Sequence, residues 1–283
     1  MIAELAELNQ YDIPGLIDLS ASVGWDYDEN EVRTLLESGR VFGHKNSAGR
    51  IVSSSAIIPY ESKLASIGMV IVHEEYRGLG LAMEAVRKCA GSITADRTVM
   101  LIATKEGQPL YEKMGFTTVD YISKFLCDKF VPENLQNHHG VFIEDFKQSD
   151  LAKLVDLDGA AVGDKRSVFL RNRISQSKQC LVVKDHNGEI IGYGLSIQGP
   201  VNLILGPIAA PDSETAALIV ENLALHHKGK LRIDVPERRT DFMSYLERSG
   251  FVKANTPPVM MKNSADMPQR NNSLYAIASQ AFG

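Results

Sequence analysis

The feature that most constrains the fold of this chain is that one pattern of residues occurs twice along it. The matching pairs are a helix-forming run (12–19 and 150–157), a strand–glycine turn–strand hairpin (41–52 and 180–191) and a Gly-Phe turn (111–116 and 246–251). The three matches keep the same order at a nearly constant offset, which is the signature of an internal repeat. A chain of 283 residues is long enough for two domains of ordinary size. We therefore expect two copies of one α/β unit.

Each copy alternates hairpin strands with helical segments, which favours a mixed, largely antiparallel twisted sheet flanked by helices. In the first copy the expected strands are 41–46, 50–58, 64–72, 98–104 and 116–128. We place the units at residues 1–130 and 140–283, the second including a C-terminal tail, with a linker at 132–140. In that tail, residues 263–272 are expected to form a polar surface loop, and the apolar run 274–278 is expected to dock as a short helix.

A glycine loop between an expected strand and an expected helix is the main candidate ligand site. The apolar run 67–72 is followed by Arg77, Gly78 and Gly80, and an amphipathic helix then begins. Free N–H groups and the positive end of the helix dipole favour an anion there, and glycine lets the main chain approach a phosphate closely. A P-loop is excluded because Gly-Lys-Ser/Thr is missing, and a dinucleotide loop is excluded because the third glycine is missing.

The spacing Arg-x-x-Gly-x-Ala at 77–82, preceded by the aromatic Tyr76, resembles the acyl-CoA pyrophosphate loop of the GNAT (GCN5-related N-acetyltransferase) superfamily. A second mark of that family, Leu-Tyr-x-x-x-Gly-Phe at 110–116, follows the expected strand 99–103. The two motifs occur in the family's order, each after an apolar strand. The whole arrangement is similar to bacterial tandem GNAT proteins, in which a catalytic first unit is fused to a divergent second one.

The resemblance implies an acetyl-CoA-dependent N-acyltransferase that transfers an acetyl group to the primary amine of a small-molecule or amino-acid-like acceptor by direct attack. It implies that Tyr111 is the general acid that protonates the departing thiolate. It also implies that Val70, Ile71 and Val72 pair with the pantetheine arm and that a backbone N–H near Ile71 or Val72 faces the thioester oxygen. The loop residues implied to hold the pyrophosphate are Arg77, Gly78, Leu79, Gly80, Leu81 and Ala82.

The acceptor side is marked by one aromatic segment. Trp25 and Tyr27 lie between the first helices, which border the acceptor groove in the fold that this chain resembles, and Asp26 or Asp28 would draw in an amine. The competing interpretation is a loop aromatic that covers the core, next to an acid that caps a helix N-terminus.

Tyr60 and Glu61, at the turn before the strand 64–72, are two further acceptor candidates. No carboxylate occurs on that strand or within 99–104, where many relatives carry their general base. The general base is therefore left unassigned, and a chain of water molecules to solvent is the alternative.

The second copy lacks the residues of this site. Its segment 212–217 aligns with the glycine loop, but Asp212 and Glu214 bring negative charge and neither glycine is present. Asp212 or Ser213 is instead a good helix N-cap, and Leu246 replaces the tyrosine. We expect the second unit to bind no CoA and to have a structural or acceptor-binding role.

Composition excludes several other classes of function. A formal net charge of −5 argues against nonspecific nucleic-acid binding, and no apolar run reaches the ~20 residues that span a bilayer. The start of the chain shows no basic-then-apolar signal, so a cytoplasmic location is expected. Cys89, Cys127 and Cys180 have no metal spacing and are expected to be buried thiols, and the pairs His138–His139 and His226–His227 are not expected to bind metal.

Two alternative functions remain open from the sequence. One is a non-catalytic acyl-CoA-binding sensor or scaffold, which the missing base favours. The other is acetylation of a protein N-terminus or lysine, which requires an open groove. The sequence does not distinguish a monomer from a homodimer, nor does it identify the acceptor or the acyl length.

Overall fold

The computed structural model describes residues 4–133, 135 and 140–282. Most of the expected linker, with His138 and His139, lies outside these residues. The first unit contains β1 (Glu4–Leu8), η1 (Gln10–Asp12), α1 (Ile13–Ser22), α2 (Glu29–Ser38), β2 (Arg40–Lys45), β3 (Ser53–Pro59), β4 (Leu64–Val72), η2 (Glu74–Tyr76), α3 (Leu81–Ala90), β5 (Thr98–Ile102), α4 (Gln108–Lys113) and β6 (Thr117–Cys127). The rest of the chain contains β7 (Phe142–Asp145), η3 (Gln148–Asp150), α5 (Leu151–Val162), α6 (Ser167–Gln176), β8 (Gln179–Lys184), β9 (Ile190–Gln198), β10 (Asn202–Ala209), α7 (Ser213–Ala224), β11 (Lys230–Pro236), α8 (Thr240–Arg248), β12 (Val252–Asn255), β13 (Pro258–Lys262) and β14 (Leu274–Ala276).

The strands of both units join into one continuous sheet, which contains 14 strands among the described residues. Its main path runs β1-β2-β3-β4-β5-β13-β6-β11-β10-β9-β8-β7. The described pairs β4–β5 and β10–β11 are parallel, and the other pairs are antiparallel, so the predicted mixed, largely antiparallel α/β fold is confirmed. The five strands expected in the first copy occur as β2 to β6, with ends that differ by a few residues.

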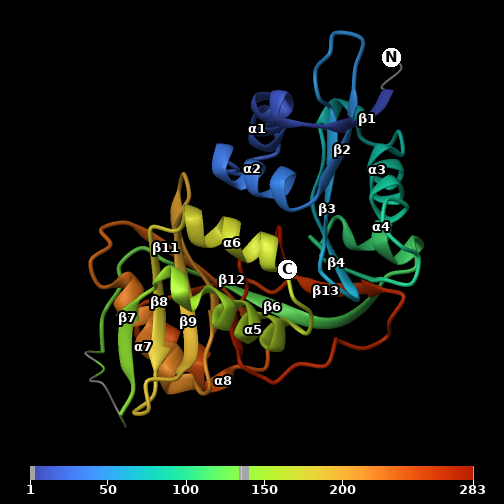
Figure 1. The fold of residues 1–283 in the computed structure, drawn as a ribbon. Coiled ribbons are helices and arrows are strands. Elements are labelled where there is room, and N and C mark those ends of the chain that lie inside the picture. The colour runs from blue at the N-terminus through green and yellow to red at the C-terminus, as the bar shows by residue number, and fades with distance from the viewer. Residues whose placement is uncertain (1–3, 134, 136–139, 283) are drawn as a thin grey trace.

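Helices cover both faces of this sheet (Figure 1). Leu16 of α1 and Leu35 of α2 share one buried cluster with Leu154 of α5 and Phe169 of α6, so these four helices lie over a common core that spans both units. Helices α3 and α4 pack on the other face of the first unit, and α7 and α8 on the other face of the second. Within the described ranges, no helix has both the length and the apolar character that crossing a bilayer requires.

The two units exchange strands at the middle of the sheet. The first half of β6 pairs with β13, whereas its second half pairs with β11 and β12. Strand β13 follows the second unit in the sequence, yet it lies between β5 and β6 of the first (Figure 1). The predicted division at residues 130 and 140 therefore falls within one shared sheet, in which residues 258–262 pair with β5 and β6 of the first unit.

The end of the tail forms a strand, so the predicted short helix at 274–278 is wrong. Strand β14 pairs with the end of β10, where Ile208 lies opposite Ala276. β10 has an edge to fill there, because its parallel pairing with β11 ends at Leu205. Unpaired backbone groups at a buried strand edge are costly, and a short apolar segment in extended form satisfies them.

Buried polar contacts fix the units against each other. The guanidinium of Arg173 on α6 lies 2.7 Å from the Glu31 carboxylate on α2, and both side chains are buried. The Asp164 carboxylate accepts the backbone N–H groups of Lys63 (2.6 Å) and Leu64 (2.9 Å) at the start of β4. Burial by itself raises the pKa of Asp164, but these hydrogen bonds hold it below its usual value. The position of β4 therefore depends on a residue of the second unit.

Candidate active site

Strands β4 and β5 separate near the middle of the first unit. They pair only over residues 64–67 of β4, which then continues to Val72 without β5 beside it. At the point of separation Met69 has φ 50°, in the left-handed region, and the register with β3 shifts, as in a β-bulge. The Ser54 hydroxyl donates to the Met69 carbonyl at 2.8 Å and holds this kink. One backbone edge of β4 is thereby opened toward the space beside β5.

The glycine loop leaves a helix N-terminus without a side-chain cap. Gly80 is the N-cap residue of α3, with φ 81°, and no described side chain caps the first turn of this helix. Gly78 and Gly80 both have left-handed φ values, and a Cβ at either would point into open space. Tyr76 is buried against Leu81, which anchors the loop at both ends. The exposed N–H groups and the dipole of α3 therefore favour an anion here.

Tyr111 is positioned by helix α4, which begins after the loop that follows β5. Its side chain is 7% exposed, and its ring packs edge-on against Phe116 with centroids 5.9 Å apart. Burial raises the pKa of Tyr111, so the hydroxyl keeps its proton at neutral pH. That hydroxyl makes no hydrogen bond to any other residue in the described part of the chain, and it remains available as a donor.

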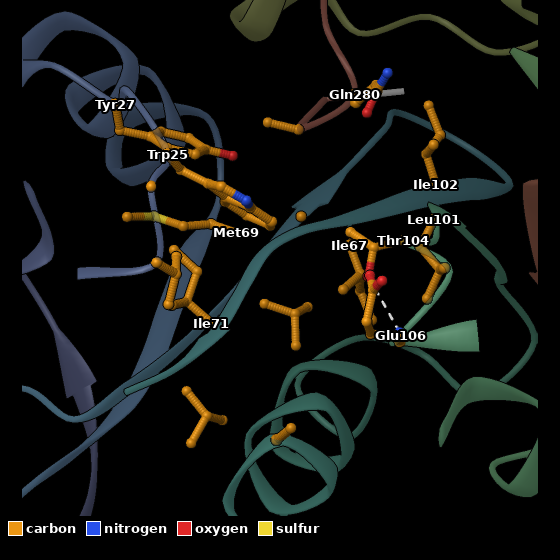
Figure 2. A pocket seen from close by; sticks show the side chains of 18 of the residues that line it. Trp25, Tyr27, Ile67, Met69, Ile71, Leu101, Ile102, Thr104, Glu106 and Gln280 are labelled. Carbon is orange, nitrogen blue, oxygen red and sulfur yellow. Dashed lines mark hydrogen bonds between the residues drawn. The ribbon is translucent and has the colours of Figure 1, made fainter. Parts of the chain in front are cut away.

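These three features line one cavity of about 1050 Å³. The sequence-predicted residues that line it are Val70, Ile71, Val72, Arg77, Gly78, Gly80, Leu81, Ala82, Tyr111, Trp25 and Tyr27. Leu79, also expected to hold the pyrophosphate, is 61% exposed and does not line the cavity. In Figure 2, Trp25 and Tyr27 lie near Met69 on one side of β4. Leu101, Ile102 and Thr104 lie on the other side of this strand. The cavity is large enough for an extended ligand with a second small molecule.

The aromatic segment before α2 forms one wall of this cavity. The rings of Trp25 and Tyr27 stack with centroids 6.1 Å apart, and the backbone N–H of each bonds to Ser20. Asp26 lines the cavity, and its carboxylate forms no hydrogen bond or ion pair with another described side chain. Asp28 instead accepts the Glu31 N–H at 2.9 Å and caps α2, as the competing interpretation expects.

Tyr60 and Glu61 are not brought to this cavity, so the structure does not support them as acceptor residues. The Tyr60 hydroxyl donates to the Phe282 carbonyl at 3.1 Å, and its side chain is buried. The Glu61 carboxylate accepts the Ser167 N–H at 3.1 Å and also the Ser167 hydroxyl. The turn before β4 faces the second unit rather than the cavity, and both residues join the two units together.

The corresponding place in the second unit is closed. The Asp212 carboxylate accepts the Thr215 N–H at 2.7 Å and caps α7, where Gly80 leaves α3 open. Strand β10 separates from β11 as β4 does from β5, but β14 pairs with the end of β10 and fills the gap. Leu246, at the position of the tyrosine, is fully buried. In the second unit, the space between β10 and β11 is therefore filled by the C-terminal strand β14.

The structure adds cavity residues that the sequence did not indicate. These residues are Lys124 on β6 and, from the second unit, Asn202, Ile204, Arg232, Asn255 and Gln280. These residues belong to no sequence motif. They reach the first unit's site only because the two units pack together in the fold. Glu106 also lines the cavity. It lies two residues beyond the segment 99–104, which carries no carboxylate, and its own carboxylate has no partner among the described residues.

The thiol prediction is confirmed, since Cys89, Cys127 and Cys180 are buried and free. Among the residues that the structure describes, no three His, Cys, Asp or Glu side chains gather in a group able to hold a metal ion.

Comparisons with known proteins agree with this geometry. Family models described as "Acetyltransferase (GNAT) domain" match residues 27–130 and 154–276. The chain is 39% identical over 284 residues to a Bacillus subtilis (strain 168) protein named "Uncharacterized N-acetyltransferase YitH", with coverage of 100% of this chain and 99% of that protein. The chain therefore belongs to the GNAT acetyltransferase family, with two such domains in tandem.

Solved structures show the same fold at low identity. A protein of Pyrococcus horikoshii superposes with a TM-score of 0.82 at 19% identity, covering 99% of this chain and 96% of that one. A tandem GNAT protein from the clavulanic acid biosynthesis pathway gives a TM-score of 0.65 at 13% identity, covering 92% of this chain and 98% of that one. The two-unit architecture is thus shared beyond close relatives.

Proposed function

We propose that the protein is an N-acetyltransferase that uses acetyl-CoA to acetylate the primary amine of a small molecule. The observation that carries this proposal is the single cavity into which the open edge of β4, the uncapped N-terminus of α3 and Tyr111 all face. An unpaired strand edge suits the amides of a pantetheine arm, and the α3 N-terminus with Arg77 suits a pyrophosphate. The residues present therefore fit acetyl-CoA as co-substrate.

When bound, acetyl-CoA supplies an activated acetyl group as a thioester. The acceptor amine attacks the thioester carbon, so that a C–N bond forms, the C–S bond breaks and the amine loses a proton. Tyr111 holds its proton at Oη and donates it to the sulfur as negative charge develops there. Backbone N–H groups of Ile71 or Val72 at the open edge stabilise the oxyanion. Asp26 and Glu106 are cavity carboxylates with no hydrogen bond or ion pair to another described side chain, and they are our candidates to take the amine proton.

The acceptor is a small molecule because both units enclose its side of the cavity. Lys124 on β6 and Asn202 and Gln280 of the second unit line the cavity together with Trp25. A protein N-terminus or a protein lysine would need an open groove there, and residues of the second unit take up part of that space. This enclosure favours a small amine over the protein-acetylation alternative.

Release of free CoA thiol tests this proposal. The full-length protein is incubated with acetyl-CoA and a panel of small primary amines, and the thiol and the acetylated amine are both measured. We expect turnover on at least one small amine and none on a peptide that carries the same amino group. Tight acetyl-CoA binding without thiol release on any amine would favour the non-catalytic acyl-CoA sensor.

A further inference from the structure

Two positively charged side chains line the acceptor side of the cavity, and both come from the paired strands β6 and β11. Phe125 of β6 and Ile233 of β11 point into the core of the second unit, so their neighbours Lys124 and Arg232 emerge on the opposite face. Both of these cationic side chains line the cavity. They are held on adjacent paired strands rather than on loops, which fixes their backbone positions.

The two cations are not fully matched by protein anions. The Arg232 guanidinium bonds to the buried Asp234 carboxylate through Nε (3.0 Å) and Nη2 (2.7 Å), and its Nη1 group has no partner among the described residues. The Lys124 ammonium forms no hydrogen bond or ion pair with any of those residues. Its side chain is partly buried, and burial followed by the nearby charge of Arg232 lowers the pKa of Lys124 despite Asp234 and Asp26. A partly buried ammonium without a partner is costly, and an anion in the cavity would relieve that cost.

The aromatic segment before α2 brings a carboxylate into the same cavity, and the charge of this carboxylate, Asp26, acts on both Lys124 and Arg232. Asp26 lies in the aromatic segment with Trp25 and Tyr27, and it also has no protein partner among the described residues. Glu31, the other carboxylate near this wall, is already neutralised by Arg173 at 2.7 Å. The cavity thus holds an ammonium, that of Lys124, and a carboxylate, that of Asp26, and neither forms a hydrogen bond or ion pair with another described residue. This pair of opposite charges fits a molecule that carries both an amino group and an acidic group.

We propose that the acceptor is an amine that also carries a carboxylate, and that Lys124 and the free edge of Arg232 bind this carboxylate. The inference rests on the proposed function, because it assigns the acceptor of the same site. A carboxylate is favoured over a doubly charged phosphate because Asp234 already neutralises Arg232, so that a single positive charge remains unmatched. Residues of both units, Lys124 on β6 and Arg232 on β11, would then select the acceptor, while the first unit holds the acyl donor.

Matched pairs of amines test this assignment. Each pair consists of an amino acid and the amine that remains when its carboxylate is removed: phenylalanine with phenethylamine, methionine with 3-(methylthio)propylamine, and lysine with cadaverine. Phosphoethanolamine and ethanolamine form a further pair for phosphate. The variants are Lys124→Met, which keeps the apolar stem and removes the charge, and the control Lys230→Met, whose side chain is 62% exposed at the start of β11 and outside the cavity.

In wild type and Lys230→Met we expect kcat/KM to be higher for at least one amino acid than for its decarboxylated partner, by about 10- to 100-fold, the usual effect of a hydrogen-bonded charge pair. Lys124→Met should lose that preference mainly through a higher KM for the amino acid. Equal kcat/KM for both members of every pair in wild type would overturn the inference, as would an undiminished preference in Lys124→Met. A preference for phosphoethanolamine alone would overturn the carboxylate assignment.

A binding measurement separates this inference from the proposed function. Thermal unfolding of the CoA-bound protein is followed with N-acetylphenylalanine, N-acetylmethionine and N-acetyllysine, and with the acetamides that lack their carboxylate. Stabilisation by at least one carboxylate compound, in wild type and Lys230→Met but not in Lys124→Met, supports the anion site even if no amine is turned over. Absence of thiol release contradicts the proposed enzyme, whereas absence of any difference between the two ligand series contradicts the carboxylate site. A mass increase from acetylation of Lys124 itself would also contradict its role as a ligand.

Discussion

Tyr111→Phe lowers kcat by about 10²- to 10⁴-fold, the range that loss of a general acid produces. The ring remains in its place against Phe116, because the substitution removes only the hydroxyl. That hydroxyl has no hydrogen bond to another described residue, so its loss leaves no buried partner unsatisfied. Steady-state thiol release gives kcat, and a calorimetric titration with acetyl-CoA should give an unchanged Kd.

Tyr121→Phe is the matched control for this variant. Tyr121 lies on β6, is 47% exposed and does not line the cavity, so the same chemical change there should leave kcat as it is. Retention of wild-type kcat by Tyr111→Phe would remove Tyr111 from the mechanism. A parallel rise in the Kd for acetyl-CoA would indicate a packing role instead.

Gly80→Asp weakens acetyl-CoA binding by about 100-fold or more. This substitution gives α3 the acidic N-cap that Asp212 provides for α7. The new carboxylate would place a negative charge where we propose that the pyrophosphate binds, and like charges in contact cost several kcal/mol. Calorimetric titration of the variant with acetyl-CoA measures the loss.

Gly49→Asp controls for backbone strain. Gly49 has φ 79°, close to the 81° of Gly80, and it also has open space around the position of a Cβ, but it lies in the β2–β3 turn outside the cavity. The affinity of the Gly49→Asp variant for acetyl-CoA should equal that of wild type. An equal loss of affinity in both variants would mean that the effect comes from strain and not from charge at the cofactor loop.

The cofactor side of the site could be predicted from the sequence because its signals are local. Arg77, the glycines and the start of α3 lie within a few residues of one another, and each follows from strand, loop and helix chemistry. The role of Asp212 as the N-cap of α7 is confirmed for the same reason, because its carboxylate bonds to a backbone N–H only three residues away.

The acceptor side depends on contacts that are far apart in the sequence. Lys124 and Arg232 reach the cavity because β6 pairs with β13 along its first half and with β11 along its second half. No spacing along the sequence indicates this pairing. Tyr60 was assigned to the acceptor because it precedes β4, but its hydroxyl bonds to the Phe282 carbonyl at the far end of the chain. The apolar character of segment 274–278 does not distinguish a helix from a strand. The segment forms a strand because it pairs with the end of β10, where the pairing of β10 with β11 has ended.

The number of acetyl-CoA molecules bound per chain tests the central claim most directly, namely that only the first of the two units keeps the cofactor site. Isothermal titration calorimetry of the full-length protein should give one site per chain, and Gly80→Asp should lose that site. Two sites per chain, or a single site that Gly80→Asp leaves unchanged, would contradict the account.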